Sequence, residues 1–202
     1  MKAIMISIQP QWVEKILNGE KTIEIRKTMP KCELPCKVYI YCTKAKLPKQ
    51  DKDCVRYDHL TKPNPYRIKK EYILGANYDE CLNGKVVAEF TLDKVNEFHI
   101  PYEAKYLYDA LNSKNENILK QSCLSIGEIL TYLKDKYYGY AWYIDNLKIY
   151  DKPKHLQELF KLCDGCEKLN TSRCANEISD CRAKTLKRPP QSWFYCQGDD
   201  KK

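Results

Sequence analysis

The sequence has no run of about 18 consecutive apolar residues, so it predicts no transmembrane helix. Its first residues form a short apolar stretch without a small-residue cleavage site, so no signal peptide is expected. Only 7 glycines and 10 prolines occur in 202 residues, which excludes collagen-like and low-complexity chains. No internal repeat is visible, which argues against a solenoid or a propeller. These absences favour a folded cytoplasmic protein with no membrane partner.

The chain is rich in charge of both signs and in cysteine. Charged residues make up 31% and hydrophobic residues 43%, which is enough apolar mass for a core. The net charge of +8 fits a nucleic-acid or nucleotide partner, although a plain lysine-rich surface is the commoner meaning of such a charge. The 11 cysteines are odd in number and lack a secretion signal. They therefore favour reduced thiols or a metal site over a disulfide framework.

Hydrophobic patterns predict several short strands and few helices. The expected strands are 3–8, 21–26, 37–43, 85–95, one strand within 139–150, and 192–196. The expected helices are one from Pro10 to Gly19, one over 103–111, one starting at Ser125 with Glu128 completing a capping box, and one opened by Pro153. The absence of a strand-helix-strand rhythm favours a small mixed barrel over a Rossmann sheet.

Residues 44–70 are strongly basic, with nine Lys or Arg against three Asp. They also contain three prolines, so we expect a long mobile loop there. Lysine and arginine are the residues that contact phosphates, which makes the loop compatible with a nucleic-acid partner.

A cluster of charge follows the Gly19 turn. Glu24 and Arg26 share one face of the expected strand, and Ile23 and Ile25 share the other, core-facing one. Lys21 is an odd number of residues from Glu24, so it can join the same pocket only if it sits at the entry to the strand. One interpretation is a solvated strand face with a surface ion pair. The other is a polar ligand site, net positive in charge, with Arg26 outside the core.

Residues 19–26 (GEKTIEIR) match the G-x-K-x-x-E-x-R signature of the ASCH family of the PUA-like superfamily. Further stretches resemble a phage and prophage branch of that family, namely 7–10, 39–44, 145–150 and 188–193. The resemblance covers most of 1–196 and implies one α+β domain, followed by a polar tail at 197–202. It implies a compact β-barrel of five or six strands, with helices that cover its openings.

The resemblance also implies a cleft that binds RNA or a modified nucleotide. Its lining would include the signature residues and two tryptophans that lie near the family's cleft and are candidate stacking platforms, namely Gly19, Lys21, Glu24, Arg26, Trp12 and Trp193. For each aromatic residue taken alone, core packing is the more common role.

Two other functions remain open at this stage. Some small bacterial ASCH proteins remove the acetyl group of N(4)-acetylcytidine, with a lysine that matches Lys21 as nucleophile or base. If this chain is such an enzyme, Lys21 and Glu24 are its candidate catalytic residues. However, those enzymes have a catalytic threonine where this chain has Glu24, so only Lys21 carries over. The other alternative is a phage-encoded protein that docks a host factor.

A cysteine-rich insert spans 163–187. Its spacing, C-x2-C-x7-C-x6-C, comes from Cys163, Cys166, Cys174 and Cys181. Four thiolates at such spacings can surround a structural zinc at about 2.3 Å per sulfur, as in a zinc knuckle. Free thiols and a disulfide are the alternatives, and Cys196 is an alternative fourth ligand. Cys32 and Cys36 are expected to be core or loop thiols.

Overall fold

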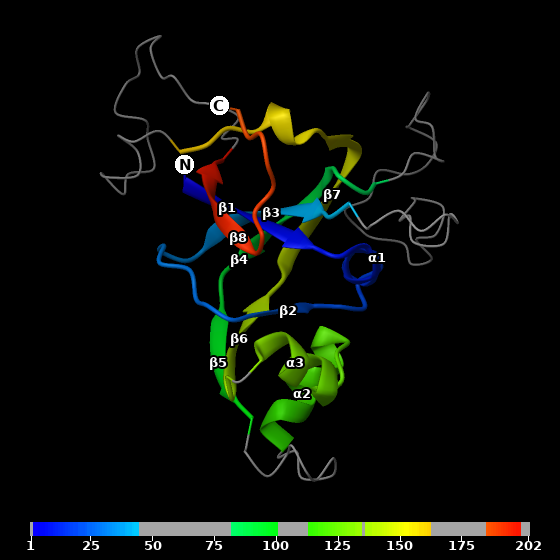
Figure 1. Cartoon of the computed structure of the whole chain (residues 1–202), viewed down its shortest axis with the longest axis vertical. Coiled ribbons are helices and arrows are strands. Elements are labelled where there is room, and N and C mark those ends of the chain that lie inside the picture. Colours follow the sequence, from blue (N-terminus) through cyan, green and yellow to red (C-terminus); the bar gives the residue numbers. More distant parts are fainter. Residues whose placement is uncertain (1, 45–81, 101–112, 135, 163–184, 199–202) are drawn as a thin grey trace.

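The structure is a computed structural model that describes residues 2–44, 82–100, 113–134, 136–162 and 185–198 (Figure 1). Within these ranges the strands are β1 (Lys2–Ile8), β2 (Ile23–Arg26), β3 (Cys36–Cys42), β4 (Val86–Leu92), β5 (Val95–His99), β6 (Tyr138–Tyr143), β7 (Asp145–Lys154) and β8 (Trp193–Gln197). The helices in the same ranges are α1 (Pro10–Leu17), α2 (Ser113–Ser122), α3 (Ile126–Leu133) and the short 3-10 helix η5 (Leu156–Glu158). None of these helices is long and apolar enough to cross a membrane.

Five strands form one mixed sheet in the order β7-β4-β3-β1-β8. β1 and β3 are parallel, and the other neighbours in this sheet are antiparallel. Both faces of β1 are covered: Ile4 and Ile6 belong to one core cluster, and Ala3 and Met5 belong to another. Burial on both faces explains why this strand has a continuous apolar sequence rather than an alternating one.

A bent antiparallel ribbon connects this sheet to a second one, of order β2-β6-β5. β4 continues into β5 and β6 continues into β7, so that β4 pairs with β7 in the first sheet and β5 pairs with β6 in the second (Figure 1). The break on one arm falls between Leu92 and Val95, and on the other at Ile144. Asn146, just beyond it, has a left-handed φ of 47°.

The ribbon corrects two expectations about the strands. Segments 85–95 and 139–150 do not each hold one strand, because each passes from one sheet into the other and is interrupted at the bend. The described part of the chain therefore has eight strands in two sheets, not five or six strands in one closed barrel. The coarser expectation of a small mixed β fold with few helices is confirmed.

The predicted start of the chain is confirmed. α1 begins with Pro10 and buries Val13, Ile16 and Leu17. Gly19 follows the helix with a φ of +73°, a conformation that side chains with a Cβ rarely adopt. The next strand is shorter than expected, because β2 begins at Ile23 and leaves Lys21 in the turn.

The later helices agree with the sequence only in part. α3 has the expected capping box of Ser125 and Glu128. The prediction of a helix that begins at Pro153 is wrong. Pro153 lies in β7, an edge strand, where a residue without a backbone N–H is tolerated. α2 was not expected. The helix expected over 103–111 lies outside the described residues, as does all of the basic segment beyond its first residue.

The core has three parts. α1 packs on one face of the five-stranded sheet, and η5 packs on the opposite face. α2 and α3 pack on the three-stranded sheet, where Ile23 and Ile25 are buried as predicted. β2 thus turns its isoleucines toward α2 and α3 and its charged residues toward the five-stranded sheet and α1, which places the charged residues between the two sheets.

Candidate functional site

A cavity of about 900 Å³ lies where the end of β1 meets α1, β2, α3 and the segment before β8. Within the part of the chain that the structure describes, its lining comes from five separate segments, listed here in chain order: Ser7, Ile8, Gln9, Gln11, Trp12, Lys21, Glu24, Ile25, Arg26, Thr43, Leu124, Ser125, Gly127, Glu128, Thr131, Tyr132, Pro190 and Gln191. The cavity therefore includes Lys21, Glu24 and Arg26, the three charged residues singled out from the sequence.

Lys21 reaches the cavity from the turn between α1 and β2. The turn is fixed by the carbonyl of Lys15, which accepts hydrogen bonds from the backbone N–H groups of Glu20 and Lys21 at 2.9 and 3.1 Å. Although its side chain is charged, Lys21 is only 2% exposed. Its Nζ donates to the carbonyl of Ser122 at 2.7 Å and lies 3.2 Å from Glu24 Oε2. The same nitrogen lies 5.5 Å from the centre of the Trp12 ring.

Glu24 bridges the two cations. Its Oε1 lies 3.1 Å from Nη2 of Arg26, and its Oε2 faces Lys21. Glu24 and Arg26 are two residues apart on β2, so a regular strand turns both to the same side. Such a network, with each carboxylate oxygen facing one cation, is held more firmly than an exposed ion pair, because little water competes for its charges.

Arg26 is more deeply buried than the sequence suggested. It is 5% exposed, and the expectation that it lies outside the core is wrong. Its Nη2 donates to the carbonyl of Ser7 at 2.8 Å, and its Nη1 donates to Oγ and O of Ser192 at 3.2 and 3.4 Å. The guanidinium therefore ties the end of β1 to the segment that enters β8. Its Nε is buried and has no hydrogen-bond partner among the described residues.

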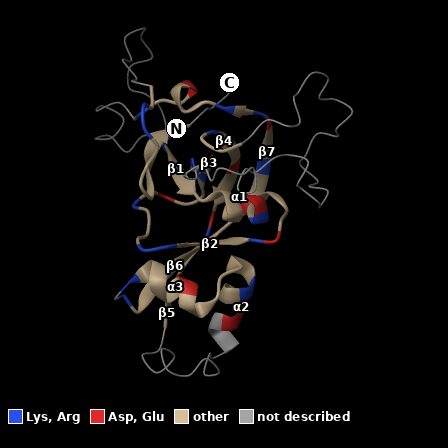
Figure 2. Ribbon diagram, turned by 45° about the vertical axis from the view of Figure 1, so that its right-hand side comes forward, with Lys and Arg blue, Asp and Glu red and all other residues tan. Residues whose placement is uncertain are grey.

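A second carboxylate changes the charge of the cavity. Glu128 also lines it, at the start of α3, where the acidic position is red in Figure 2. The backbone N–H of Ser125 donates to this carboxylate, and this bond, together with the Ser125 hydroxyl and the charge of Lys21, lowers the pKa of Glu128. With Lys21, Arg26, Glu24 and Glu128, the charged groups that the described residues bring to the lining sum to zero. The expectation of a net positive site counted only Lys21, Arg26 and Glu24 and did not include Glu128.

The other residues named from the sequence divide between the cavity and its surroundings. Trp12 lines the cavity, whereas Trp193 does not appear in the lining. The ring of Trp193 lies between those of Trp142 and Tyr195, at centroid distances of 5.6 and 5.4 Å. Its indole N–H donates to Thr28 Oγ1 at 3.0 Å. Gly19 stays outside the lining and shapes the turn that delivers Lys21.

The α3 side of the cavity was missed by sequence reasoning. Gly127, Glu128, Thr131 and Tyr132 all line it. The capping box was a visible signal for the start of α3, but nothing in the local sequence indicates that this helix end faces β2. Its position depends on the packing of Ile126, Ile129 and Leu133 against the three-stranded sheet, as the third core cluster shows.

The four proposed zinc ligands, Cys163, Cys166, Cys174 and Cys181, lie outside the described residues, so the zinc site stays a prediction. Across the described ranges, no group of three or more His, Cys, Asp or Glu residues is placed to hold a metal. Cys196, the alternative ligand, is fully buried in β8.

Two cysteines expected to be ordinary core or loop thiols lie close together. The sulfur atoms of Cys32 and Cys36 are 3.5 Å apart, with Cys36 buried and Cys32 half-buried. The hydrogen bond from Cys36 is the main cause that lowers the pKa of Cys32 to about 7, and the charge of Lys2 adds to it. The same pairing, together with burial, raises the pKa of Cys36.

Of the comparisons with known proteins, the one with solved structures supports the fold. No protein-family model and no curated protein sequence matches the chain. Among solved structures, ASCH from Zymomonas mobilis aligns with a TM-score of 0.51 and 16% identity, over 96% of this chain and 86% of that one. A mutant of the same protein gives a TM-score of 0.51 and 16% identity, over 96% of this chain and 87% of that one. The chain therefore shares the fold of an ASCH protein.

Proposed function

We propose that this protein binds RNA or a modified nucleotide, with a base held in the cavity against Lys21, Glu24 and Arg26. The observation that carries the proposal is that these three charged groups, all nearly buried, form one network at the wall of a cavity. A buried network of this kind is weak as a stabilising device, since apolar side chains of similar volume often serve as well or better. Its place beside an open volume favours a role in recognition.

The chemistry of the lining suits a base better than a phosphate. The charged groups of the described lining residues sum to zero, so these residues offer an anion no net attraction. Glu24 is an acceptor that can receive N–H donors from a base edge. Arg26 Nε is a donor without a partner among the described residues, and Trp12 supplies an aromatic surface beside Lys21. Together these groups provide the hydrogen-bonding and stacking contacts by which proteins read unpaired bases.

The hydrolase alternative meets an obstacle at Lys21. Its Nζ is held by two groups of the fold, the Ser122 carbonyl at 2.7 Å and a Glu24 oxygen at 3.2 Å. A lysine that acts as a nucleophile has to leave such partners before its nitrogen can reach a substrate. The surroundings of Lys21 therefore favour a binding role over a catalytic one.

The test compares two substitutions of the same chemical kind. Glu24→Gln changes the carboxylate in the cavity, and Glu20→Gln changes an exposed carboxylate that is paired with Lys15 at 3.5 Å. Binding of a labelled single-stranded RNA and of each ribonucleoside is followed by fluorescence anisotropy and calorimetry. We expect Glu24→Gln to weaken binding by about 1.5–3 kcal/mol, the usual contribution of a hydrogen bond to a charged group. Glu20→Gln should bind as wild type does, and circular dichroism checks that both variants are folded.

A second arm decides between the functions. Wild type and Lys21→Ala are incubated with N(4)-acetylcytidine, and release of cytidine is measured. Release that depends on Lys21 would replace the binding proposal with the hydrolase. If wild type neither binds RNA or nucleosides nor releases cytidine, the cavity has another use. The interaction protein suggested by the phage-like sequence stretches then becomes the leading proposal.

A further inference from the structure

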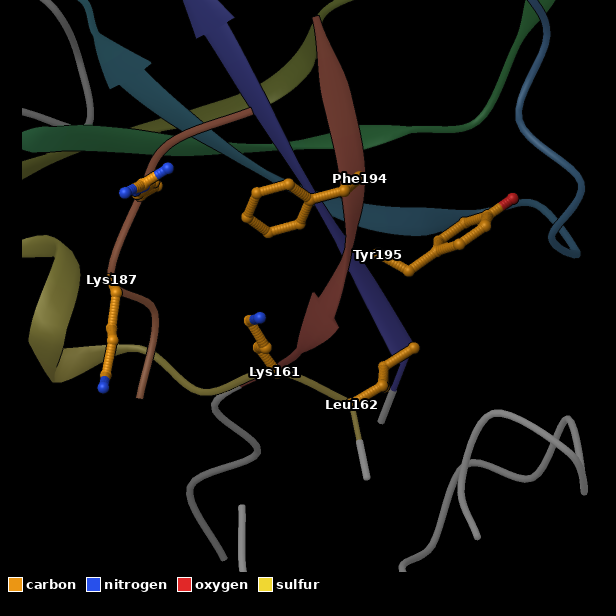
Figure 3. A pocket seen from close by; sticks show the side chains of 6 residues that line it. Lys161, Leu162, Lys187, Phe194 and Tyr195 are labelled. Atoms are coloured by element: carbon orange, nitrogen blue, oxygen red, sulfur yellow. The ribbon is translucent and has the colours of Figure 1, made fainter. Parts of the chain in front are cut away.

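A second cavity, of about 730 Å³, lies beside β8 and is separate from the first. The described residues that line it are Lys161, Leu162, Lys187, Arg188, Phe194 and Tyr195 (Figure 3). They come from the segment after η5, from the segment before β8 and from β8 itself. The backbone holds these parts together: Lys161 bridges to Cys196, and the N–H of Gln197 donates to the carbonyl of Phe160 at 3.0 Å.

The charges that the described residues bring to this cavity are of one sign. Among them, Lys161, Lys187 and Arg188 line it and no acidic residue does, in contrast to the first cavity, where the charges of the described lining residues cancel. The ion pairs found among the described residues involve none of these three cations. Lys161, Lys187 and Arg188 are all exposed, so they can approach an anion with little loss of hydration.

The two aromatic residues differ in how they are used. Tyr195 is occupied: its hydroxyl accepts from the Lys31 N–H at 2.5 Å, and its ring contacts Trp193 and the Lys2 amine. Phe194 is half-buried and has no such ring contact among the described residues. In Figure 3 the two side chains extend from opposite sides of β8, and Lys161 points into the space beside Phe194. Phe194 is therefore the aromatic ring that a ligand can reach.

The two cavities share one segment of chain. Lys187 and Arg188 line the second, and Pro190 and Gln191 line the first. The segment is anchored at the first cavity, where the hydroxyl of Ser7 donates to the carbonyl of Pro190 at 2.7 Å. From Arg188 to Gln191 the chain spans at most about 11 Å. A single RNA strand that enters one cavity can therefore continue into the other.

We infer that the second cavity binds the backbone phosphates and a neighbouring base of the single-stranded RNA whose first base occupies the Glu24 cavity. This inference rests on the proposed function and assigns a different part of the RNA to each of the two cavities. The neutral cavity takes a base, and the basic cavity supplies the phosphate contacts that the first lacks, with Phe194 as a stacking surface. A basic groove combined with an aromatic ring is the usual means of holding an unpaired strand.

The test measures binding of a labelled single-stranded RNA of about ten nucleotides over a range of salt concentrations. The variants are Lys161→Glu, Arg188→Glu and the double variant that combines them, and Lys152→Glu is the control matched in charge to each single change. Lys152 is an exposed lysine of β7, at the opposite edge of the same sheet. Phe194→Leu is compared with Phe160→Leu, since Phe160 is exposed nearby but does not line the cavity. Ribonucleosides, which carry no phosphate, report on the first cavity alone.

We expect the double variant to lose at least tenfold in RNA affinity at low salt. The slope of log affinity against log salt should become shallower by about 0.7 for each phosphate that the protein no longer neutralises. Phe194→Leu should weaken RNA binding by about tenfold, with little change in the salt slope. Lys152→Glu and Phe160→Leu should bind RNA as wild type does. Nucleoside binding by the double variant and by Phe194→Leu should also match wild type.

Other outcomes separate the two proposals. If RNA binding depends on Glu24 but survives in the double variant and in Phe194→Leu, the second site is refuted and the proposed function stands. If RNA binding is abolished in the double variant but is unaffected by Glu24→Gln, the second cavity binds RNA and the base site is refuted. If Lys152→Glu weakens binding as much as Lys161→Glu and Arg188→Glu each do, the effect is general charge and the second site is refuted. If wild type does not bind RNA, the inference fails as well.

Discussion

The amine of Lys21 donates a hydrogen bond of 2.7 Å to the carbonyl of Ser122, the last residue of α2. The last carbonyls of a helix have no partner within the helix, and a lysine amine is well suited to meet one. Cys123, the next residue, has a left-handed φ of 55°, as is common just after a helix. Lys21 thus joins the signature segment to α2, about a hundred residues later in the chain.

We therefore expect Lys21→Ala to destabilise the fold by about 2 kcal/mol, because it removes a buried charge-assisted hydrogen bond and an ion-pair partner of Glu24. Lys15→Ala is the control, since Lys15 pairs with Glu20 at the exposed surface. That change should cost less than about 1 kcal/mol. Urea unfolding of both variants measures the difference. An equal loss of unfolding free energy in the two variants would show that the hydrogen bond from Lys21 to Ser122 stabilises the fold no more than the exposed pair of Lys15 and Glu20 does.

Arg26→Ala should be more damaging, by about 3–5 kcal/mol, because it leaves buried acceptors without a donor. The guanidinium serves Ser7, Ser192 and Glu24 at once. Lys27→Ala, at the next position, removes only a cation above the Tyr132 ring, 5.1 Å from its centre, and should cost less than about 1 kcal/mol. Denaturant unfolding distinguishes the two. An Arg26→Ala protein of wild-type stability would contradict the burial described for this residue.

The capping box of α3 predicts a pH dependence of stability. The pKa of Glu128 is lowered from its ordinary value of 4.5, mainly by the hydrogen bond from the Ser125 backbone. A lowered pKa in the folded state means that the ionised carboxylate stabilises the fold above about pH 4.5, and that this contribution is lost as the pH falls through the lowered value.

The measurement is the melting temperature of wild type and Glu128→Gln from neutral to acid pH. Wild type should be the more stable at neutral pH, and the gap should close in acid. Ser125→Ala should cost about 1 kcal/mol at neutral pH, as the loss of a helix cap usually does. A gap between wild type and Glu128→Gln that stays constant with pH would contradict the assignment.

Cys32 should be the readily alkylated thiol of the described residues. Its pKa is about 7, so its reactive thiolate fraction rises from a small share to most of the molecules as the pH increases through 7. Burial raises the pKa of Cys42 to about 12, so that thiol should stay inert over the same range. Timed iodoacetamide labelling with peptide mass spectrometry gives the rate at each cysteine.

The Cys36→Ser variant tests the cause of this reactivity. It replaces the thiol that lies 3.5 Å from Cys32 with a hydroxyl. If the sulfur–sulfur contact sets the pKa of Cys32, the midpoint of its labelling curve should move in Cys36→Ser, whereas Cys123→Ser should leave it in place. An unchanged midpoint in both variants would show that the contact with Cys36 does not set the pKa of Cys32.

The cysteine-rich insert carries a separate prediction. Reduced protein should contain about one zinc per chain, since four thiolates complete the coordination of a structural zinc. Replacing either Cys163 or Cys166 by serine should remove most of the metal. Cys123→Ser, a change outside the insert, should leave the zinc content intact. Less than half an equivalent of zinc in wild type, or a disulfide between any two of the four sulfurs, would refute the site.

The sequence determined the features that depend on neighbouring residues. The left-handed turn at Gly19 and the capping box at Ser125 are set by local backbone chemistry, and both are present. The alternation of Ile23 and Ile25 with Glu24 and Arg26 also fixed which side of β2 would be buried among apolar groups. The placement of Lys21 at the entry to the strand was inferred from its separation from Glu24 by an odd number of positions. Each of these features requires no more than about six residues of chain.

Only the tertiary structure decided how distant segments meet. The bends that divide 85–95 and 139–150 between two sheets arise because both arms of one ribbon must turn together, and no local pattern records that pairing. Arg26 is buried because Ser7 and Ser192 close over it, and Glu128 cancels the charge of the cavity because α3 packs against β2. The burial of the site thus depends on contacts between residues 19 and 166 positions apart, and its charge depends on the packing of a helix about a hundred residues later in the chain. Hydrophobic periodicity encodes neither.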